Sequence, residues 1–371
     1  MMDCPGLKDS LIACRADKLR WNQDVASGQM AAPTIVETAS FYLSDPELTP
    51  RQVVARVAEY DARGLTAIKV YDPLSSEAYR AAAHESRRRG LRLVGHLPQS
   101  VSLAEALAAG QDSFEHAHLL PRSCFEDAAQ WQVGALSKLS PTARLSAIIE
   151  GYDPQRCEDI VTQLASSSAW YVPTHVTRED DVRAFDEDGS TSKALDYLDP
   201  LSRWAWNDDQ SALRAAYPDR SGKRALYRYF AHGLQLTGKA HQAGVRILVG
   251  TDTIAGGLRY HDELAHLITA GMTPAAALRA ATIEVARYAG EGDVAGTIAI
   301  GKRADLVLLA HNPLTSIAQS RSVRAVIQNG RLYDQGKLRN LDTFARNQAR
   351  APHNWAKLLW GFARSSINSE M

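Results

Sequence analysis

The fold is decided by residues 67–96, which read AIKVYDPLSSEAYRAAAHESRRRGLRLVGH. Two short runs rich in β-branched residues, 67–71 and 91–96, enclose a segment with helical spacing that closes on Gly90. A glycine at that position can take the left-handed conformation that ends a helix. A strand–helix–strand unit of this kind is typical of a parallel sheet.

The same pattern recurs along most of the chain. Further strand-like runs lie at residues 34–38, 112–116, 170–175 and 245–252, and further helices are expected over 50–63, 103–109 and 236–243, before Gly64, Gly110 and Gly244. The repetition predicts an α/β fold. A (β/α)₈ TIM barrel, with active residues at the carboxyl ends of its strands, is favoured over a doubly wound sheet because polar residues stand at several strand ends.

Near the end of the sequence, alternating strands and helices give way to successive short strands. Thr273-Pro274 begins a helix that runs to Ala289, and short strands follow at 294–300, 305–309, 323–328 and 331–333, with an Asn329-Gly330 hairpin turn. We therefore expect a barrel over 1–293, with a partly helical insertion over the site at 178–232, and a small β-sandwich remnant over 294–340. A helical tail over 341–371 would pack through Trp355, Leu358, Leu359 and Phe362.

Composition excludes several classes of protein. With 45% hydrophobic and 23% charged residues over 371 positions, the chain is neither disordered nor collagen-like. Its 42 Lys+Arg balance its 42 Asp+Glu, so we expect no nucleic-acid partner. No stretch approaches the roughly 18 consecutive apolar residues of a membrane-spanning helix.

The cysteines and the amino terminus give weaker indications. Cys4, Cys14, Cys124 and Cys157 form no C-x-x-C pair, which predicts ordinary thiols rather than a zinc ribbon or a disulfide scaffold. No basic start followed by an apolar run is present, so no secretory signal is expected in this sequence. The compartment stays open, with the cytoplasm as the default, because a signal could be missing with the start of the chain.

Ionisable residues close the expected strands. Lys69 lies inside an apolar strand, where its ammonium would be costly unless it is paired or modified. His96, His116, His175 and Asp252 each stand where a strand ends. Each alone is explained by hydrogen bonding or solvation, but Lys69, His96, His116 and Asp252 at the same end of successive units favour a shared metal site.

The segments that carry these residues resemble the amidohydrolase superfamily. The resemblance covers nearly the whole chain and rests on Ile68-Lys69-Val70-Tyr71, Val94-Gly95-His96, Ser113-Phe114-Glu115-His116, Gly250-Thr251-Asp252, the block from Glu263-Leu264 through Gly271-Met272-Thr273-Pro274 and Ala280-Ala281-Thr282, and Gly301-Lys302-Arg303-Ala304-Asp305-Leu306-Val307. More narrowly, the chain is similar to the imidazolonepropionase-like and Xaa-Pro or Xaa-Arg dipeptidase branch. That resemblance implies a metal-dependent hydrolase of amide, peptide or cyclic amide C–N bonds.

The resemblance also implies a ligand set. Lys69 would add CO₂ to become a carbamate that bridges two metals, His96 and His116 would hold the second metal, and Asp252 would bind the first metal and shuttle protons. The implied metal is Zn²⁺, with one or two divalent ions bound. His175, Tyr71 and His261 are candidate contacts for a small-molecule or dipeptide substrate, with simple packing as the alternative for His175. An oligomer is possible.

One element of the family pattern is missing from this sequence. Members begin with a His-x-His on the first barrel strand, yet no histidine precedes Lys69. The one His-x-His, His116-Ala117-His118, falls on the sixth family strand, so His118 is interpreted as a neighbour rather than a ligand. Residues 11–28 and 32–36 resemble the helix after the second strand and the third strand. We therefore expect a chain that lacks the first strand and most of the second, and the alternative function is a catalytically impaired or inactive remnant that acts in binding.

Overall fold

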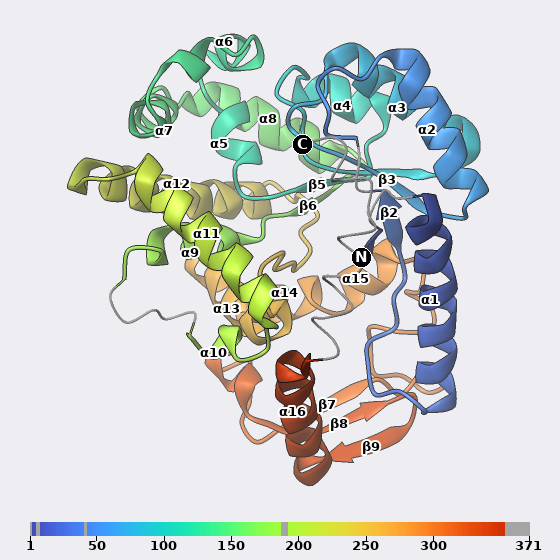
Figure 1. Ribbon diagram of the computed structural model, residues 1–371. Helices are drawn as coiled ribbons and strands as arrows, with labels where there is room; N and C mark the ends of the chain where they lie inside the picture. The colour runs from blue at the N-terminus through green and yellow to red at the C-terminus, as the bar shows by residue number, and fades with distance from the viewer. Residues whose placement is uncertain (1, 5–7, 41–42, 187–191, 353–371) are drawn as a thin grey trace.

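A computed structural model describes residues 2–4, 8–40, 43–186 and 192–352 (Figure 1). Its main sheet has four parallel strands in sequence order: β1 (Met2–Cys4), β2 (Thr38–Ser40), β3 (Ala67–Val70) and β4 (Arg92–Gly95). A second parallel pair joins β5 (Ser113–Glu115) to β6 (Trp170–Val172). The Asp112 backbone N–H donates to Leu93 O at 2.7 Å and so links the two sheets. The predicted α/β class with parallel strands is confirmed.

Helices connect the strands and cover their outer side. Between the first five strands lie α1 (Lys8–Ser27), α2 (Pro50–Ala62), α3 (Ser76–Arg89) and α4 (Leu103–Ala109). The remaining helices are α5 (Leu119–Ser123), α6 (Ala128–Gln132), α7 (Pro141–Glu150), α8 (Pro154–Ser166), α9 (His175–Arg183), α10 (Ser192–Leu195), α11 (Pro200–Ala216), α12 (Arg220–Gln242), α13 (Gly256–Thr269), α14 (Pro274–Ala280), α15 (Ile283–Tyr288) and α16 (Gln335–Arg350), with 3₁₀ turns η1 (Ala135–Lys138) and η2 (Ile317–Arg321).

Local sequence explains where these helices begin and end. The Ser75 hydroxyl accepts from the Ala78 N–H at the start of α3, and Gly90 ends that helix at φ 70°, as the sequence predicted. Ser102 and Gly110 bound α4 in the same way. Helix α12 is much longer than the expected segment 236–243, because its Asp219 cap places the start sixteen residues earlier, at Arg220.

Two expected strands differ from the structure. Residues 34–37 form no strand, because side chains of α1 take the place of a neighbouring strand: the Asn22 amide bonds both backbone groups of Ile35 at 2.8 Å, and Lys18 Nζ donates to Val36 O at 2.9 Å. The strand itself begins at Thr38. Residues 245–252 contain no named strand either, and pair with β6 through a single bridge, Tyr171 to Ile247.

The expected helix over 274–289 is also interrupted. The Thr273 hydroxyl caps it and Pro274 opens it, but α14 ends at Ala280 and α15 begins at Ile283. Thr282 lies between them at φ −133° and ψ −89°, which is not helical, and its hydroxyl donates to Leu278 O at 2.7 Å.

A small antiparallel sheet follows, with β7 (Leu306–Leu309), β8 (Val323–Gln328) and β9 (Arg331–Asp334). The predicted Asn329-Gly330 hairpin is confirmed, since both residues have positive φ, 48° and 77°. Residues 294–300 form no strand. The C-terminal helix α16 begins at Gln335, ahead of the expected boundary at 341, and the stripe from Trp355 to Phe362 lies outside the described residues.

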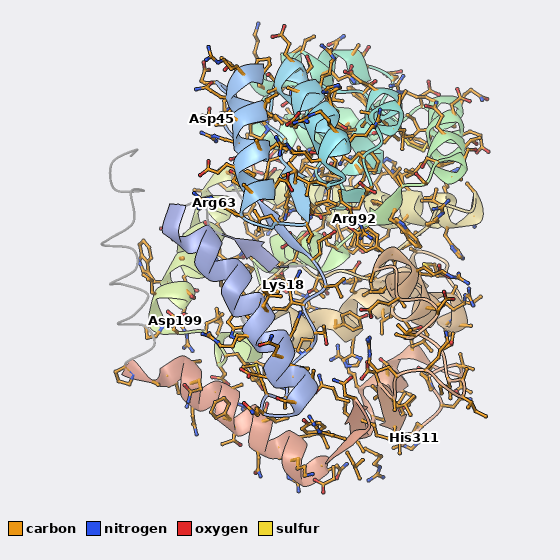
Figure 2. The ribbon with its side chains drawn as sticks, turned by 90° about the vertical axis from the view of Figure 1, so that its right-hand side faces the viewer. Lys18, Asp45, Arg63, Arg92, Asp199 and His311 are labelled. Carbon is orange, nitrogen blue, oxygen red and sulfur yellow. A yellow bond between two sulfur atoms is a disulfide. The ribbon has the colours of Figure 1, made fainter. Side chains whose placement is uncertain are left out.

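The small sheet lies at the bottom of the molecule in Figure 1, the parallel strands lie across its middle, and α1 runs along one side from one to the other (Figures 1 and 2). The Arg331 guanidinium donates to Ser27 O at 2.5 Å, so the end of α1 is held against the hairpin of the small sheet. Among the described residues, no helix is both long enough and apolar enough to cross a bilayer.

The prediction that all four cysteines are ordinary thiols is wrong for one pair. Cys124, which follows α5, and Cys157, in the first turn of α8, form a disulfide. Their separation of 33 residues hid the pairing, while the fold brings their Cα atoms to 4.4 Å. The side chains of Cys4 and Cys14 lie outside the described part of the structure.

Gly95, the last residue of β4, leads to a first prediction. Its φ is 111°, and a Cβ atom there would lie 2.5 Å from Val70 O and 2.9 Å from Lys69 Cγ. We expect Gly95→Ala to lower the free energy of unfolding by about 3 kcal/mol, through backbone strain and a steric clash. Gly90→Ala is the control: it has a similar left-handed φ but nothing within 4 Å, and should cost about 1 kcal/mol. If denaturant unfolding shows that both variants lose the same free energy of unfolding, the close approach of residue 95 to Val70 O does not matter.

Candidate metal centre

Three residues just past strand ends have unusual backbone conformations. His116 follows β5, Thr174 follows β6, and Asp252 follows the bridged segment, with φ values of 74°, 48° and 41°. Non-glycine residues at positive φ cost on the order of 1–3 kcal/mol each and gather at functional sites. Since the carboxyl ends of these parallel segments meet, the strained residues lie around one mouth.

The imidazoles of His96 and His116 face one another at this mouth. Their Nε2 atoms are 3.1 Å apart. The other ring nitrogen of His96 contacts Asp72 Oδ1 at 2.9 Å, and that of His116 contacts Thr174 Oγ1 at 2.9 Å. Asp252 Oδ2 lies 3.4 Å from His116 Nε2. His116 Nε2 therefore has one imidazole nitrogen and one carboxylate oxygen within 3.4 Å, and both are donor types that a small cation takes.

Burial sets the protonation of His116. Desolvation, followed by the nearby His118 and His96, holds the pKa of His116 well below its ordinary value. The ring is therefore neutral near pH 7, as a metal ligand must be. Asp252 differs in that its side chain is 54% exposed, so a substrate can reach its carboxylate.

Lys69 lies in the wall of an adjoining cavity of about 340 Å³, together with Glu115, Thr174 and Asp252. Its side chain is 5% exposed, and Nζ lies 3.4 Å from Glu115 Oε2. Burial raises the pKa of the Glu115 carboxyl, while the charge of Lys69 opposes that shift. Nζ also lies 5.2 Å from the centre of the Tyr71 ring, which itself packs 4.8 Å from the His96 ring.

A second group of donors overlaps with the first. Asp72, His96 and His118 each offer a ligand atom, and these atoms lie within 4.8 Å of one another. His118 Nε2 is buried without a hydrogen-bond partner and approaches Asp72 Oδ1 only to 3.7 Å. Burial lowers the pKa of His118 to about 3, so this ring is also neutral. The donor chemistry of both groups fits a divalent ion such as Zn²⁺, and they share His96.

Asp72 was missed by the sequence reasoning, although the same rule points to it. It stands two residues past the end of β3, as His96 stands one past β4. Arg122 Nη1 donates to its Oδ2 at 2.7 Å. Burial alone would raise the pKa of Asp72, but the approach of His118, the hydrogen bond with His96 and the charge of Arg122 together hold it far below its usual range.

Of the three candidate substrate contacts, Tyr71 packs against His96, whereas His175 and His261 contact other residues. His175 is completely buried, and its Nε2 lies 3.0 Å from Thr237 Oγ1. This environment agrees with simple packing, the alternative to a substrate contact. The Glu263 carboxylate accepts from the backbone N–H groups of His175 and Val176 at 2.9 Å and so caps α9. Nδ1 of His261 contacts Ser320 Oγ of η2 at 2.9 Å.

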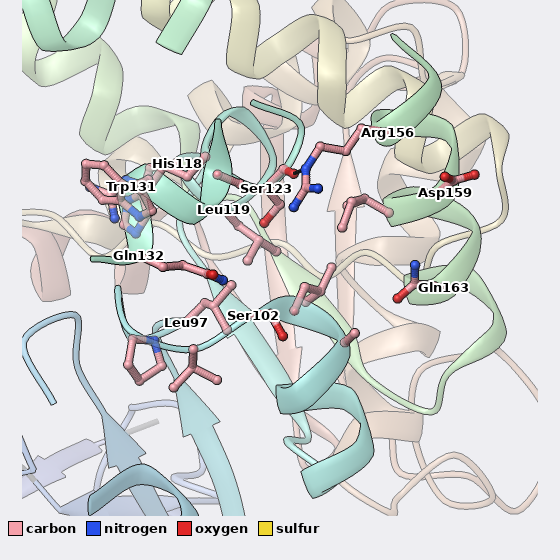
Figure 3. Close-up of a pocket in the computed structure, with 17 residues that line it drawn as sticks. Leu97, Ser102, His118, Leu119, Ser123, Trp131, Gln132, Arg156, Asp159 and Gln163 are labelled. Carbon is pink, nitrogen blue, oxygen red and sulfur yellow. Dashed lines mark hydrogen bonds between the residues drawn. The ribbon is translucent and has the colours of Figure 1, made fainter. Parts of the chain in front are cut away.

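A further cavity, of about 250 Å³, lies beside the site between the segments that follow β4 and β5 (Figure 3). His118 belongs to its wall and to the donor group around Asp72. The Arg122 guanidinium carbon lies 4.5 Å from the centre of the Trp131 ring in the same wall. Arg122 therefore joins this cavity to the carboxylate of Asp72.

The buried imidazole of His175 leads to a prediction on pH dependence. Burial lowers its pKa to about 3, so its contribution to stability is complete above about pH 6.5 and is lost as the pH falls from there toward 3. Between about pH 7.5 and pH 5, His175 should remove about 2 kcal/mol from the free energy of unfolding of metal-free protein. His175→Gln should flatten this dependence in denaturant titrations, whereas the exposed His84→Gln should not. An unchanged pH dependence in His175→Gln would contradict this account.

Comparison with known proteins places the chain in a family. The model of the Amidohydrolase family matches residues 32–333, which is most of the sequence. The chain belongs to the amidohydrolase family. The resemblance stated from the sequence is thereby confirmed at the level of the family, whose members generally use divalent metals.

The amidohydrolase is also similar to individual proteins. It is 27% identical to adenine deaminase 2 of Agrobacterium fabrum (strain C58 / ATCC 33970) over 324 residues, which is 83% of this chain and 50% of that protein. The chain therefore spans about half the length of this curated relative.

Solved structures show the same fold. A bottromycin amidohydrolase matches with a TM-score of 0.59 and 25% identity, over 81% of this chain and 62% of that chain. A Xaa-Pro dipeptidase with methionine bound in its active site matches with a TM-score of 0.53 and 19% identity, over 85% and 72%. These neighbours support the expected barrel-type α/β architecture.

Proposed function

We propose that this amidohydrolase is a metal-dependent hydrolase of C–N bonds in amides, dipeptides or cyclic amides. The observation that carries the proposal is the convergence of His96 Nε2 and His116 Nε2 at 3.1 Å, with Asp252 Oδ2 3.4 Å from the second of them. His96 and His116 follow β4 and β5, and Asp252 follows the segment bridged to β6, and barrel enzymes place their chemistry at such carboxyl ends.

His96, His116 and Asp252 are the side chains that would hold the metal. A divalent ion such as Zn²⁺ would polarise the substrate carbonyl and lower the pKa of water at this site. Asp252 is half-exposed, so its carboxylate can take a proton from the attacking water and pass it to the leaving nitrogen. Thr174 Oγ1 holds the far nitrogen of His116 and so fixes the orientation of that ring.

Lys69 is proposed to take up CO₂ as a carbamate, whose oxygens would help to hold a second divalent metal. Carbamate formation releases two protons, one from the ammonium and one from the nitrogen once it has bonded to CO₂; solvent that reaches the shared cavity would take both, against the pull of the Glu115 carboxylate 3.4 Å away. The carbamate would extend into the cavity that Lys69 shares with Asp252. ¹³C NMR of protein equilibrated with ¹³CO₂ should show a carbamate signal that Lys69→Ala lacks.

The test uses the purified chain, stripped of metal by a chelator and then reconstituted with Zn²⁺. The substrate panel contains Xaa-Pro and Xaa-Arg dipeptides and a cyclic imide, which the family resemblance implies. It also contains adenine, because one relative is an adenine deaminase. The proposal expects hydrolysis of at least one compound that disappears on chelation and returns with Zn²⁺. Zinc binding without hydrolysis of any compound would reject the proposed activity for this chain.

A catalytically impaired protein is the second candidate, because two observations favour it. No histidine occurs among the first 68 residues, so the sequence supplies no His-x-His before Lys69. Lys69 also pairs with Glu115, which stabilises the ammonium form that cannot take up CO₂. Purified protein that binds no zinc and hydrolyses nothing would support this candidate, which would then act through binding of a small molecule or assembly with another copy.

A further inference from the structure

Arg156 lines the cavity of about 250 Å³ with most of its hydrogen-bonding capacity unused (Figure 3). The residue is partly buried in the first turn of α8, and its Nε donates to Ser123 O at 2.8 Å. Within the described residues, its two terminal nitrogens have no hydrogen bond and no ion pair with a carboxylate. A guanidinium carries five N–H donors, so four of them remain for a ligand or for water.

The contact between Arg156 and Ser123 is held in place by a covalent link. The residues that follow them, Cys157 and Cys124, form the disulfide, with their Cα atoms 4.4 Å apart. Ser123 is the last residue of α5, where a helix leaves its carbonyls without an intrahelical partner. Arg156 therefore satisfies a helix end with one N–H, and the disulfide fixes the point from which the rest of its guanidinium enters the cavity.

The charge of Arg156 is not balanced by the other ionisable side chains of this wall. Arg122 donates to the carboxylate of Asp72 at 2.7 Å, so its charge is already paired. Among the described residues, Asp159 is the one acidic residue of the wall, but it is exposed, contacts Gln155 Nε2 at 3.4 Å and points away from Arg156 (Figure 3). The cavity therefore has one uncompensated positive charge.

The rest of the cavity is suited to an apolar group. Leu97, Leu103, Leu119 and Ile160 contribute to its wall, and the last three are at most 7% exposed. Its volume lies below the about 300–1,000 Å³ of pockets that hold drug-sized ligands, so an occupant must be small. The planar guanidinium matches the two oxygens of a carboxylate, to which it can donate two parallel hydrogen bonds.

We propose that this cavity binds a small carboxylate with an apolar body, such as an aromatic acid, through the terminal nitrogens of Arg156. The apolar body would displace water from the leucine side of the cavity. The site adjoins the candidate metal centre, because His118 lines the cavity and belongs to the donor group around Asp72. Hydrolysis of an amide leaves a carboxylate, so the ligand class includes one product of the proposed reaction; this link alone rests on the proposed function.

The test titrates 4-fluorobenzoate into the chelator-treated chain and follows its ¹⁹F NMR signal, because metal-free protein offers no zinc for the carboxylate to bind. The wild type should bind this acid at least about 10-fold more tightly than acetate, which lacks the apolar body, and than 4-fluorobenzamide, which lacks the charge. Arg156→Gln should weaken binding of the acid about 10–100-fold, through loss of the charged hydrogen bonds, and leave binding of the amide unchanged.

Arg144→Gln is the matched control, because Arg144 also donates from Nε to a backbone carbonyl, that of Leu136 at 3.2 Å, but does not line the cavity. It should bind the acid as the wild type does. Arg156→Lys keeps the charge without the planar pair of donors, so it should show an intermediate loss, and it serves if Arg156→Gln does not fold.

Unchanged affinity for the acid in a folded Arg156 variant would overturn the proposal, as would the absence of any binding by the wild type. Tighter binding of the amide, or of inorganic phosphate in competition with the acid, would also overturn it, because the ligand would then not be an apolar carboxylate. Since the titration needs neither metal nor turnover, a failure of the proposed hydrolase activity is distinguished from a failure of this proposal.

Discussion

Asp252→Asn is expected to lower the rate of hydrolysis by about 10²–10⁴-fold, because the amide keeps the shape of the side chain but cannot accept a proton. The carboxylate is half-exposed and lies 3.4 Å from His116 Nε2, so it is open to substrate on one side and held to the ligand pair on the other. The measurement is the single-turnover rate with whichever substrate of the panel is hydrolysed, at saturating zinc.

Asp159→Asn is the control for this substitution. Asp159 lies on α8, in the outer wall of the neighbouring cavity, and contacts only Gln155 Nε2, at 3.4 Å, in the hydrogen bonds of the described structure. Its rate should stay within about 2-fold of the wild type, as is usual for surface substitutions. Comparable rates for Asp252→Asn and Asp159→Asn would remove Asp252 from the proposed chemistry.

His116→Gln is expected to reduce the zinc bound after dialysis by the largest amount of any substitution at the site. The change removes a ligand nitrogen that lies 3.1 Å from His96 Nε2, and so leaves His96 to face the cation with Asp252. Loss of a metal ligand should weaken zinc binding by more than the roughly 10–100-fold that follows loss of a residue hydrogen-bonded to a ligand. Elemental analysis of zinc per chain gives the answer.

His118→Gln separates the two overlapping donor groups. If His96 and His116 hold the ion, this variant keeps its zinc while His116→Gln loses it. The reverse outcome would assign the ion to Asp72, His96 and His118, whose ligand atoms also lie within 4.8 Å of one another.

The alternation of strands and helices could be predicted because its signals are local. Gly90 and Gly110 end helices where a left-handed residue is needed, and a polar side chain caps the amino end of each of these helices. Parallel strands end on one side of a sheet, which is why His96, His116 and Asp252 were expected to be neighbours; His116 Nε2 lies 3.1 Å from His96 Nε2 and 3.4 Å from Asp252 Oδ2.

The remaining features depend on contacts between distant segments. The strand expected at 34–38 was displaced because Asn22, on α1, bonds the backbone of Ile35. His175 was a candidate for substrate contact with simple packing as the alternative; Thr174 turns the chain at φ 48° and Glu263 caps α9, and the imidazole is buried. The disulfide between Cys124 and Cys157 likewise follows from the packing of α5 against α8 and not from any spacing motif.

The most direct measurement is anomalous diffraction at the zinc absorption edge from crystals of the protein reconstituted with Zn²⁺. This account predicts a peak between His96 and His116, within about 2.1 Å of both Nε2 atoms. A peak bound instead by Asp72 and His118, or no peak at this mouth in zinc-saturated crystals, would contradict it.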